Sequence, residues 1–99
     1  MQYKELVAEI IKEMSGSDIQ ELYRNLYEKE YVVIVLHITN AFWYPEFIYT
    51  SDTEEVDKIY NENTQVCILH TENFLDEFML YANTEQKKIY DHLAEEAAI

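Results

Sequence analysis

The sequence predicts a mixed α+β fold in which about five helices pack on a small three-stranded sheet, a β-hairpin plus one strand, in the order ααββαβαα. Apolar residues recur at helical spacing in five segments, while the longest apolar stretch has the period of a strand. A single glycine and a single proline predict short loops. Because 99 residues suffice for one apolar core, we expect a single domain over residues 1–99.

The first two helices are indicated by consecutive apolar stripes. Residues 2–14 place their apolar side chains on one side of a helix, and Gly16 then predicts a left-handed end. Ser17 and Gln20 have the spacing of a capping box, so a second helix is expected to begin there. We expect the two helices to form an αα-hairpin with facing apolar sides.

The next part of the chain predicts a β-hairpin. Residues 31–39 (YVVIVLHIT) are β-branched and apolar on both faces, which indicates a central strand covered on each side or pressed into an interface. Asn40 and Ala41 form a tight connection to a second strand over residues 42–50. Pro45 lacks a backbone donor, so this second strand is expected at the edge of the sheet.

One strand and three helices complete the expected fold. Ser51 and Glu54 have the spacing of a capping box ahead of a short third helix. Residues 65–70 (QVCILH) are expected to form the third strand. Thr71 or Asn73 is expected to cap a fourth helix, and the last helix is expected over residues 84–98.

The net charge excludes one class of function. The chain has 20 Asp and Glu residues against 7 Lys and Arg, a net charge of −13. A surface of this sign repels phosphates, so we expect no direct binding to DNA or RNA.

The longest apolar run, residues 32–36, is too short to span a membrane, and the single Cys67 excludes an internal disulfide. We therefore expect a soluble cytoplasmic protein, in the host cytoplasm if a phage encodes it.

The residues that could support catalysis are few. Cys67 and His70 have a familiar ligand spacing, but residues three apart on a strand point to opposite faces. A thiol between Val66 and Ile68 in an acidic chain has a raised pKa, which disfavours a nucleophile. A single glycine leaves no phosphate-binding loop. We expect no enzyme, no catalytic residue, no metal and no cofactor.

Four groups of acidic residues have few cations near them in the sequence. Like charges four residues apart destabilise a helix by a few tenths of a kcal/mol per pair, so a function that uses the charge would explain them. Such carboxylates are about 6 Å apart along the helix, comparable to successive phosphates of a nucleic acid. The candidate phosphate-mimicking carboxylates that would bind a partner are Glu5, Glu9 and Glu13; Asp52, Glu54, Glu55 and Asp57; Glu72, Asp76 and Glu77; and Glu95 and Glu96.

Aromatic residues concentrate on the expected edge hairpin, beyond what so small a sheet is expected to bury. Aromatic side chains are enriched in protein interfaces, so this hairpin is a candidate contact with a partner or with a second copy. Together with the two-faced apolar strand, it predicts a homodimer. The candidate contact residues are Trp43, Tyr44, Phe47 and Tyr49, whereas Tyr23, Tyr27, Tyr60 and Tyr90 lie on helical stripes and are expected in the core.

In its small size, its charge of −13, the row of Glu5, Glu9 and Glu13, the acidic groups at 52–57 and 72–77 and its glycine-poor composition, the sequence resembles a class of inhibitors. These are the small acidic DNA-mimic proteins of bacteriophages and mobile elements, which include anti-restriction proteins and anti-CRISPR inhibitors. The resemblance implies a protein, dimeric in many cases, that occupies the DNA-binding surface of a host protein. That host protein could be a restriction endonuclease, a CRISPR nuclease, a repair enzyme or a nucleoid protein.

A second interpretation stays open. An acidic interaction module, such as an adaptor, an antitoxin-like protein or an immunity protein, would use its charge to reach one basic partner without imitating DNA. The two interpretations differ in whether DNA competes for the same surface of the partner. They also differ in whether the carboxylates form rows on one face or scatter around the domain.

Overall fold

A computed structural model describes residues 3–97 and confirms the predicted order of elements within them. Residue 2, where the first helix is expected to begin, and residue 98, where the last is expected to end, lie outside the described residues. The elements are α1 (Tyr3–Lys12), α2 (Gly16–Asn25), β1 (Tyr31–Ile38), β2 (Trp43–Thr50), α3 (Thr53–Glu62), β3 (Val66–His70), α4 (Thr71–Tyr81) and α5 (Thr84–Ala97).

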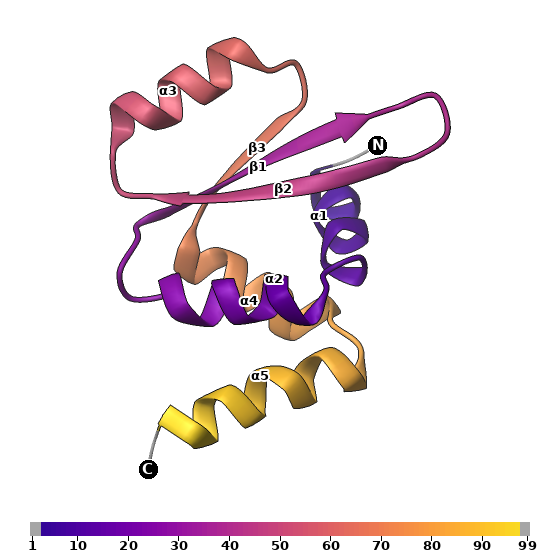
Figure 1. The fold of residues 1–99 in the computed structure, drawn as a ribbon, viewed down its shortest axis with the longest axis vertical. Helices are drawn as coiled ribbons and strands as arrows, with labels where there is room; N and C mark the ends of the chain where they lie inside the picture. Colours follow the sequence, from indigo (N-terminus) through magenta and orange to yellow (C-terminus); the bar gives the residue numbers. More distant parts are fainter. Residues whose placement is uncertain (1–2, 98–99) are drawn as a thin grey trace.

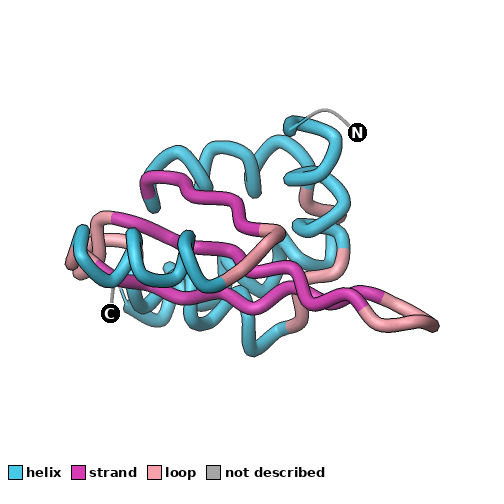
Figure 2. The backbone as a smooth tube through the Cα atoms, turned by 90° about the horizontal axis from the view of Figure 1, so that it is seen from above, coloured by secondary structure: helices cyan, strands magenta, loops and turns pink. Residues whose placement is uncertain are grey.

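The sheet has the strand order β2-β1-β3, and β1 is antiparallel to both neighbours. This confirms β1 as the central strand and β2, which contains Pro45, as an edge strand. The pairing of β1 with β2 continues to Ile38 and Trp43, whereas β3 pairs only with residues 31–35 of β1. The end of the β1–β2 hairpin therefore extends past β3, and in Figures 1 and 2 its turn projects beyond the helices.

The two faces of the sheet carry separate apolar clusters because alternate side chains of β1 point in opposite directions. Val32 and Ile34 belong to the larger cluster, which includes residues of α1, α2, α4 and α5. Val33 and Val35 belong to the smaller cluster, which Val56 of α3 covers. Figure 1 accordingly shows α3 on one side of the sheet and the other helices on the opposite side. The prediction of a strand covered on both faces is confirmed for residues 32–35, which are buried.

The helices below the sheet do not form the predicted αα-hairpin. α1 packs mainly against α4, and α2 packs mainly against α5, which lies farthest from the sheet (Figure 1). Phe74 and Phe78 of α4 are fully buried between these helices and the sheet. An apolar stripe predicts which side of a helix is buried but not which element covers it, and for this reason the expectation was wrong.

The start of α2 also differs from the prediction. Ser15, not Ser17, is the N-cap, because its hydroxyl accepts a hydrogen bond from the Asp18 backbone N–H at 3.2 Å. The Asp18 carboxylate in turn accepts a hydrogen bond from the Ser15 N–H at 2.8 Å, which completes a capping box. Gly16 is consequently the first residue of the helix and does not have a positive φ, so the left-handed end predicted there is wrong.

The start of α3 is likewise displaced by one residue. Asp52, not Ser51, is the N-cap, and its carboxylate accepts a hydrogen bond from the Glu54 N–H at 2.9 Å. The Ser51 hydroxyl instead accepts a hydrogen bond from the Glu30 N–H at 3.0 Å, which connects the two ends of the hairpin. A carboxylate at this position also interacts favourably with the positive end of the helix dipole.

Neither predicted residue caps α4. His70 occupies the N-cap position without a side-chain hydrogen bond to the helix. Thr71 is the first helical residue, is buried, and donates its hydroxyl to the Lys29 carbonyl at 2.7 Å. The expected cap residues, Thr71 and Asn73, therefore lie inside the helix, because the hydroxyl of Thr71 satisfies a buried carbonyl of another segment.

A buried glutamine connects the first and last helices. The Gln86 side-chain amide donates hydrogen bonds to the carbonyls of Ile11 and Met14, at 2.8 and 3.1 Å, where α1 ends. Its oxygen accepts from the Asn83 N–H at 3.0 Å, and the Asn83 side chain accepts from the Gln86 N–H at 2.8 Å. Gln86 thus satisfies backbone groups at the end of α1 and at the start of α5.

Candidate functional site

The acidic row of α1 is directed to solvent. Glu5, Glu9 and Glu13 are exposed because Ile10 and Ile11 hold the opposite side of the helix in the core. Among the described side chains, the cation that pairs with this row is Lys12, whose Nζ lies 3.5 Å from Glu9 Oε1. An exposed pair of this kind within one helix is worth at most about 0.5 kcal/mol. The row therefore keeps most of its charge.

The acidic group before and within α3 lies on the other side of the sheet (Figure 1). Its four members are exposed, and Val56 between them packs on the sheet. Three of the four have no other structural role among the described contacts, whereas Asp52 also caps the helix. The members are Asp52, Glu54, Glu55 and Asp57.

The acidic residues of α4 differ in exposure. Glu72 and Asp76 are exposed, whereas Glu77 is half-buried. The Oε2 atom of Glu77 is buried and has no hydrogen-bond partner among the described side chains and backbone. Glu77 is therefore less accessible to a partner than the other two residues.

The acidic residues of α5 lie on the outermost helix. Glu95 and Glu96 are exposed, and Glu96 Oε1 lies 3.0 Å from His92 Nε2. Since α3 is on one side of the sheet and α1, α4 and α5 are on the other, the four acidic groups occupy at least two separate surfaces. The carboxylates do not share a single face.

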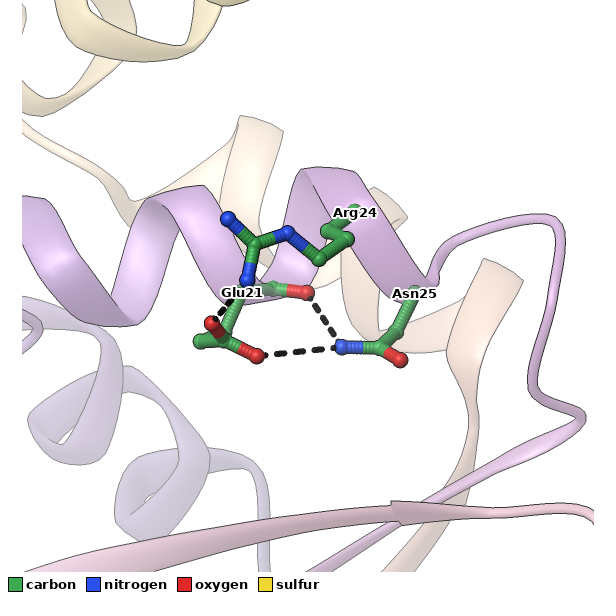
Figure 3. Close-up of polar contacts among 3 residues, drawn as sticks. All are labelled: Glu21, Arg24 and Asn25. Carbon is green, nitrogen blue, oxygen red and sulfur yellow. Dashed lines mark hydrogen bonds and ion pairs between the residues drawn. The ribbon is translucent and has the colours of Figure 1, made fainter.

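The described Lys and Arg side chains form ion pairs only within their own helices. Figure 3 shows the shortest of these pairs, in which Arg24 Nη1 lies 2.9 Å from Glu21 Oε1. In the same group, Asn25 donates to the Glu21 carbonyl at 2.8 Å and to its carboxylate at 3.4 Å. Each Lys or Arg pair among the described side chains joins residues three apart: Lys12 with Glu9, Arg24 with Glu21, and Lys88 with Glu85.

The four aromatic residues predicted as contacts separate into two pairs. Trp43 and Tyr44, near the end of the hairpin, are 38% and 47% exposed. Phe47 and Tyr49 are half-buried and pack against the larger cluster, where the ring of Phe47 lies 5.9 Å from that of Phe74. The expectation that all four exceed what the core can bury is wrong for Phe47 and Tyr49, because the helices below the sheet extend under these two residues.

Tyr49 has an unusual hydroxyl group. The oxygen is buried and makes no hydrogen bond to any part of the chain that the structure describes. Burial raises the pKa of this phenol, and the negative charges of Asp18 and Glu21 raise it further. Tyr49 is therefore held neutral inside the protein and is unsuited to contact a partner.

The end of the hairpin exposes two more apolar residues that the sequence analysis did not single out. Ile38 and Phe42 are 65% and 62% exposed. Thr39 shapes the turn between them, because its hydroxyl and its N–H both donate to the Phe42 carbonyl at 2.8 Å. A usable signal was the position of both residues next to the turn.

The two faces of the hairpin end carry different groups. On one face the Tyr44 ring stacks on His37, with centroids 4.9 Å apart, and His37 Nε2 lies 2.8 Å from Glu46 Oε1. On the other face Ile38 and Trp43 are cross-strand neighbours. The first face thus carries His37, Tyr44 and Glu46, which have polar groups. The second face carries the mainly apolar side chains of Ile38 and Trp43.

The helical tyrosines also separate. Tyr90 is buried and Tyr23 is half-buried, with their rings 5.6 Å apart in an edge-to-face arrangement. Tyr27 and Tyr60 are 88% and 59% exposed, so their expected core positions are wrong. Tyr27 follows the end of α2 at Asn25, and Tyr60 is exposed although it lies one turn after the buried Val56 of α3.

Cys67 is buried on β3, and burial raises the pKa of its thiol, as the sequence predicts. Residues 3–97 contain no group of three or more His, Cys, Asp or Glu side chains placed to hold a metal ion. Among the described helices, none is sufficiently long and apolar to cross a membrane.

No protein-family model matches the chain, and no curated protein or solved structure is significantly similar to it. The charge and the geometry of the chain are therefore the basis on which a function can be assigned.

Proposed function

We propose that this protein is a DNA-mimic inhibitor that occupies the DNA-binding surface of a basic host protein. The observation that supports it best is the exposed row of Glu5, Glu9 and Glu13 on α1. These carboxylates stand four residues apart on a helix whose one described cation pair is weak. A partner with a groove of Lys and Arg side chains would bind such a row as it binds successive phosphates.

The energetics of this mode differ from those of a compact hot spot. Each carboxylate is exposed and replaces one phosphate contact, so each contributes little and the sum is large. The like-charge repulsion along α1 is relieved when a basic groove covers it. Binding should consequently weaken steeply with added salt. Salt screens the attraction between the carboxylates and the basic groove, as it does the attraction between phosphates and that groove.

The partner is a host DNA-binding protein: a restriction endonuclease, a CRISPR nuclease, a repair enzyme or a nucleoid protein. In this proposal the protein catalyses no reaction, needs no cofactor and does not bind nucleic acid itself. A homodimer would lengthen the charged surface. The face of the hairpin that carries Phe42 and Tyr44 is available for that contact, and sedimentation at micromolar protein concentration tests it.

The alternative is an acidic interaction module that binds one basic partner without imitating DNA. One observation favours it: the acidic groups of α1 and α3 lie on opposite sides of the sheet (Figure 1), so a partner groove cannot cover both at once. In that case the charge steers association and the exposed aromatic residues at the hairpin end supply the affinity.

A competition experiment separates the two functions. Labelled duplex DNA is bound to a member of each of the four partner classes, and fluorescence anisotropy follows its release as this protein is added. A DNA mimic releases the DNA, and its apparent affinity falls with salt. An interaction module that binds a partner and leaves the DNA in place would contradict mimicry.

Matched variants then locate the mimicking surface. One variant replaces Glu5, Glu9 and Glu13 by Gln, and a second replaces the exposed acids of α3, Glu54, Glu55 and Asp57, by their amides. Each removes the same charge, and Asp52 is retained so that α3 keeps its cap. We expect the α1 variant to lose most of the DNA-releasing activity and the α3 variant to lose less.

A further inference from the structure

A groove separates α1 from the end of the β1–β2 hairpin. Its volume is about 690 Å³. Leu36, Ile38 and Trp43 form one side, on the same face of the sheet as the larger cluster. Leu6 of α1 forms the other side, with the carboxylate-bearing residues Glu5 and Glu9 beside it. The groove thus combines an apolar floor with negative charge on one wall, and we call it the α1–hairpin groove.

The edge of β1 beside this groove lacks a neighbouring strand. The N–H of Leu36 donates to the carbonyl of Gln65 at 2.9 Å, which is the last contact of β1 with the β3 side that the structure gives. Residues two apart on a strand direct their backbone groups to the same edge. Ile38 therefore directs its N–H and carbonyl toward the β3 side, where the register leaves it no strand partner within residues 3–97.

The chemistry of the groove identifies what can fill it. A bare strand edge accepts an extended segment by backbone hydrogen bonding, with alternate side chains entering the groove. A guanidinium or ammonium group in that position meets two carboxylates, Glu5 and Glu9, and the side chain of Trp43, which is 38% exposed. An apolar residue two positions from that cation lies on the same face of the segment and would cover Ile38, which is 65% exposed.

We propose that the α1–hairpin groove binds an extended segment of a basic partner, in which an Arg or Lys and an apolar residue stand two positions apart. The proposal rests on the proposed function only in that the partner is a basic protein. It adds a defined contact surface to the negative charge of α1. It also explains why an acidic protein keeps a tryptophan and an isoleucine exposed beside the acidic row.

A second copy of this chain fits the groove less well. Each copy carries a net charge of −13, so two copies repel each other where Glu5 and Glu9 already concentrate negative charge. A basic segment relieves that repulsion instead of adding to it. Charge complementarity therefore selects a basic partner for this face of the hairpin.

The first experiment uses the isolated protein and short synthetic peptides. The probe is a peptide in which arginine and valine stand two positions apart, separated by serine, and NMR follows the backbone amides and the tryptophan indole. We expect the resonances of Leu36, Ile38 and Trp43 to shift. The same peptide with glutamate in place of arginine tests the charge, and oligoarginine tests the apolar contribution. Equal binding of any control peptide at these residues would overturn the proposal, as would resonances that shift with protein concentration alone.

Matched variants make the test specific. Replacing Glu5 and Glu9 by Gln should weaken the binding of the arginine–valine peptide by about tenfold, whereas the same change at Glu95 and Glu96 on α5 should have little effect on binding. Trp43→Ala should also weaken binding by about tenfold, and Tyr44→Ala on the other face of the hairpin serves as its control. Should Trp43→Ala disturb folding, the glutamate variants still decide. Equal losses in a variant and its control would contradict the proposal.

The two proposals fail in different ways. If the peptide binds in the groove but no DNA is released from any partner class, the groove is supported and the mimic function fails. If DNA is released but the peptide does not bind and Trp43→Ala has no effect on release, the mimic function is supported and the groove fails.

Discussion

β1 passes through two different environments within one strand. Over residues 31–35 it has a strand on each side, and residues 32–35 are buried. Past Leu36 it pairs only with β2 in the described chain, and its exposure rises until Ile38 is 65% exposed. The residue types hardly change between the two regions. The ends of β3 and of the helices, and not the sequence of β1, therefore decide where the apolar surface is buried and where it can meet a partner.

The largest expected effect compares Ile34 with Ile38, two isoleucines on the same face of β1. Ile34→Ala should lower the free energy of unfolding by about 3 kcal/mol, because the side chain is completely buried. Ile38→Ala should lower it by less than about 0.5 kcal/mol. Urea denaturation followed by circular dichroism measures both. A similar loss in both variants would mean that the hairpin end is covered in solution, and the two regions would no longer differ.

The buried body of the protein also depends on one polar side chain. Gln86→Leu should lower the free energy of unfolding by about 2 kcal/mol, because it leaves carbonyls at the end of α1 without donors. Gln20→Leu, at an exposed position of α2, is the control and should change stability by less than about 0.5 kcal/mol. If the two leucine variants were equally stable, the end of α1 would not depend on Gln86.

A smaller effect is expected at Tyr49, whose buried hydroxyl has no partner in the described residues. Tyr49→Phe should raise the free energy of unfolding by about 1 kcal/mol, since it removes an unsatisfied polar group without changing shape. Tyr44→Phe, at the exposed hairpin end, should change stability by less than about 0.5 kcal/mol. Loss of stability in Tyr49→Phe would indicate that the hydroxyl is hydrogen-bonded in solution.

The pH dependence at Tyr49 has a definite sign. The folded protein holds the pKa of this phenol above its ordinary value of 10.0, so the unfolded chain loses the proton first. The contribution of the protonated phenol to the free energy of unfolding is fully present below pH 10.0 and is lost as the pH rises above it. Wild-type stability should therefore fall more steeply above that pH than the stability of Tyr49→Phe. Parallel curves for the two proteins would contradict the burial of the hydroxyl.

The sequence predicts the elements well because periodicity is a local property. Its two-faced strand, its edge proline and its helical stripes all correspond to observed elements. Packing partners and caps are less predictable. Ser15 and Ser17 are equally good caps in isolation, and the distinction between them depends on where α1 ends. From the local sequence, Gln86 looks like a surface residue of its helix. Its burial could not be predicted because only the folded chain brings the carbonyls of α1 next to it.

The candidate site divides in the same way. The exposure of Glu5, Glu9 and Glu13 follows from the helical period and is confirmed. The relation between the acidic groups of α1 and α3 could not be predicted, because it depends on which side of the sheet the β2–β3 connection crosses. The groove beside Trp43 also could not be predicted, since it forms only because β3 is shorter than the hairpin.

The smallest expected effect concerns the row of α1 itself. Replacing Glu5, Glu9 and Glu13 together by Gln should raise the free energy of unfolding by a few tenths of a kcal/mol for each like-charged pair removed. Added salt should stabilise the wild-type protein more than this variant, because salt screens the repulsion that the variant lacks. Glu9→Gln alone should have a smaller effect, since it also removes the weak ion pair with Lys12.

The direction of that small change separates two roles for the carboxylates. If the triple variant gains stability and loses binding to a basic partner, the row is costly to the free protein and useful only in the complex, as phosphate mimicry requires. If the triple variant loses stability, the carboxylates make favourable contacts within the folded chain. Their exposure beside the groove would then serve the fold, and Trp43 and Ile38 at the hairpin end would be the part of the molecule that recognises a partner.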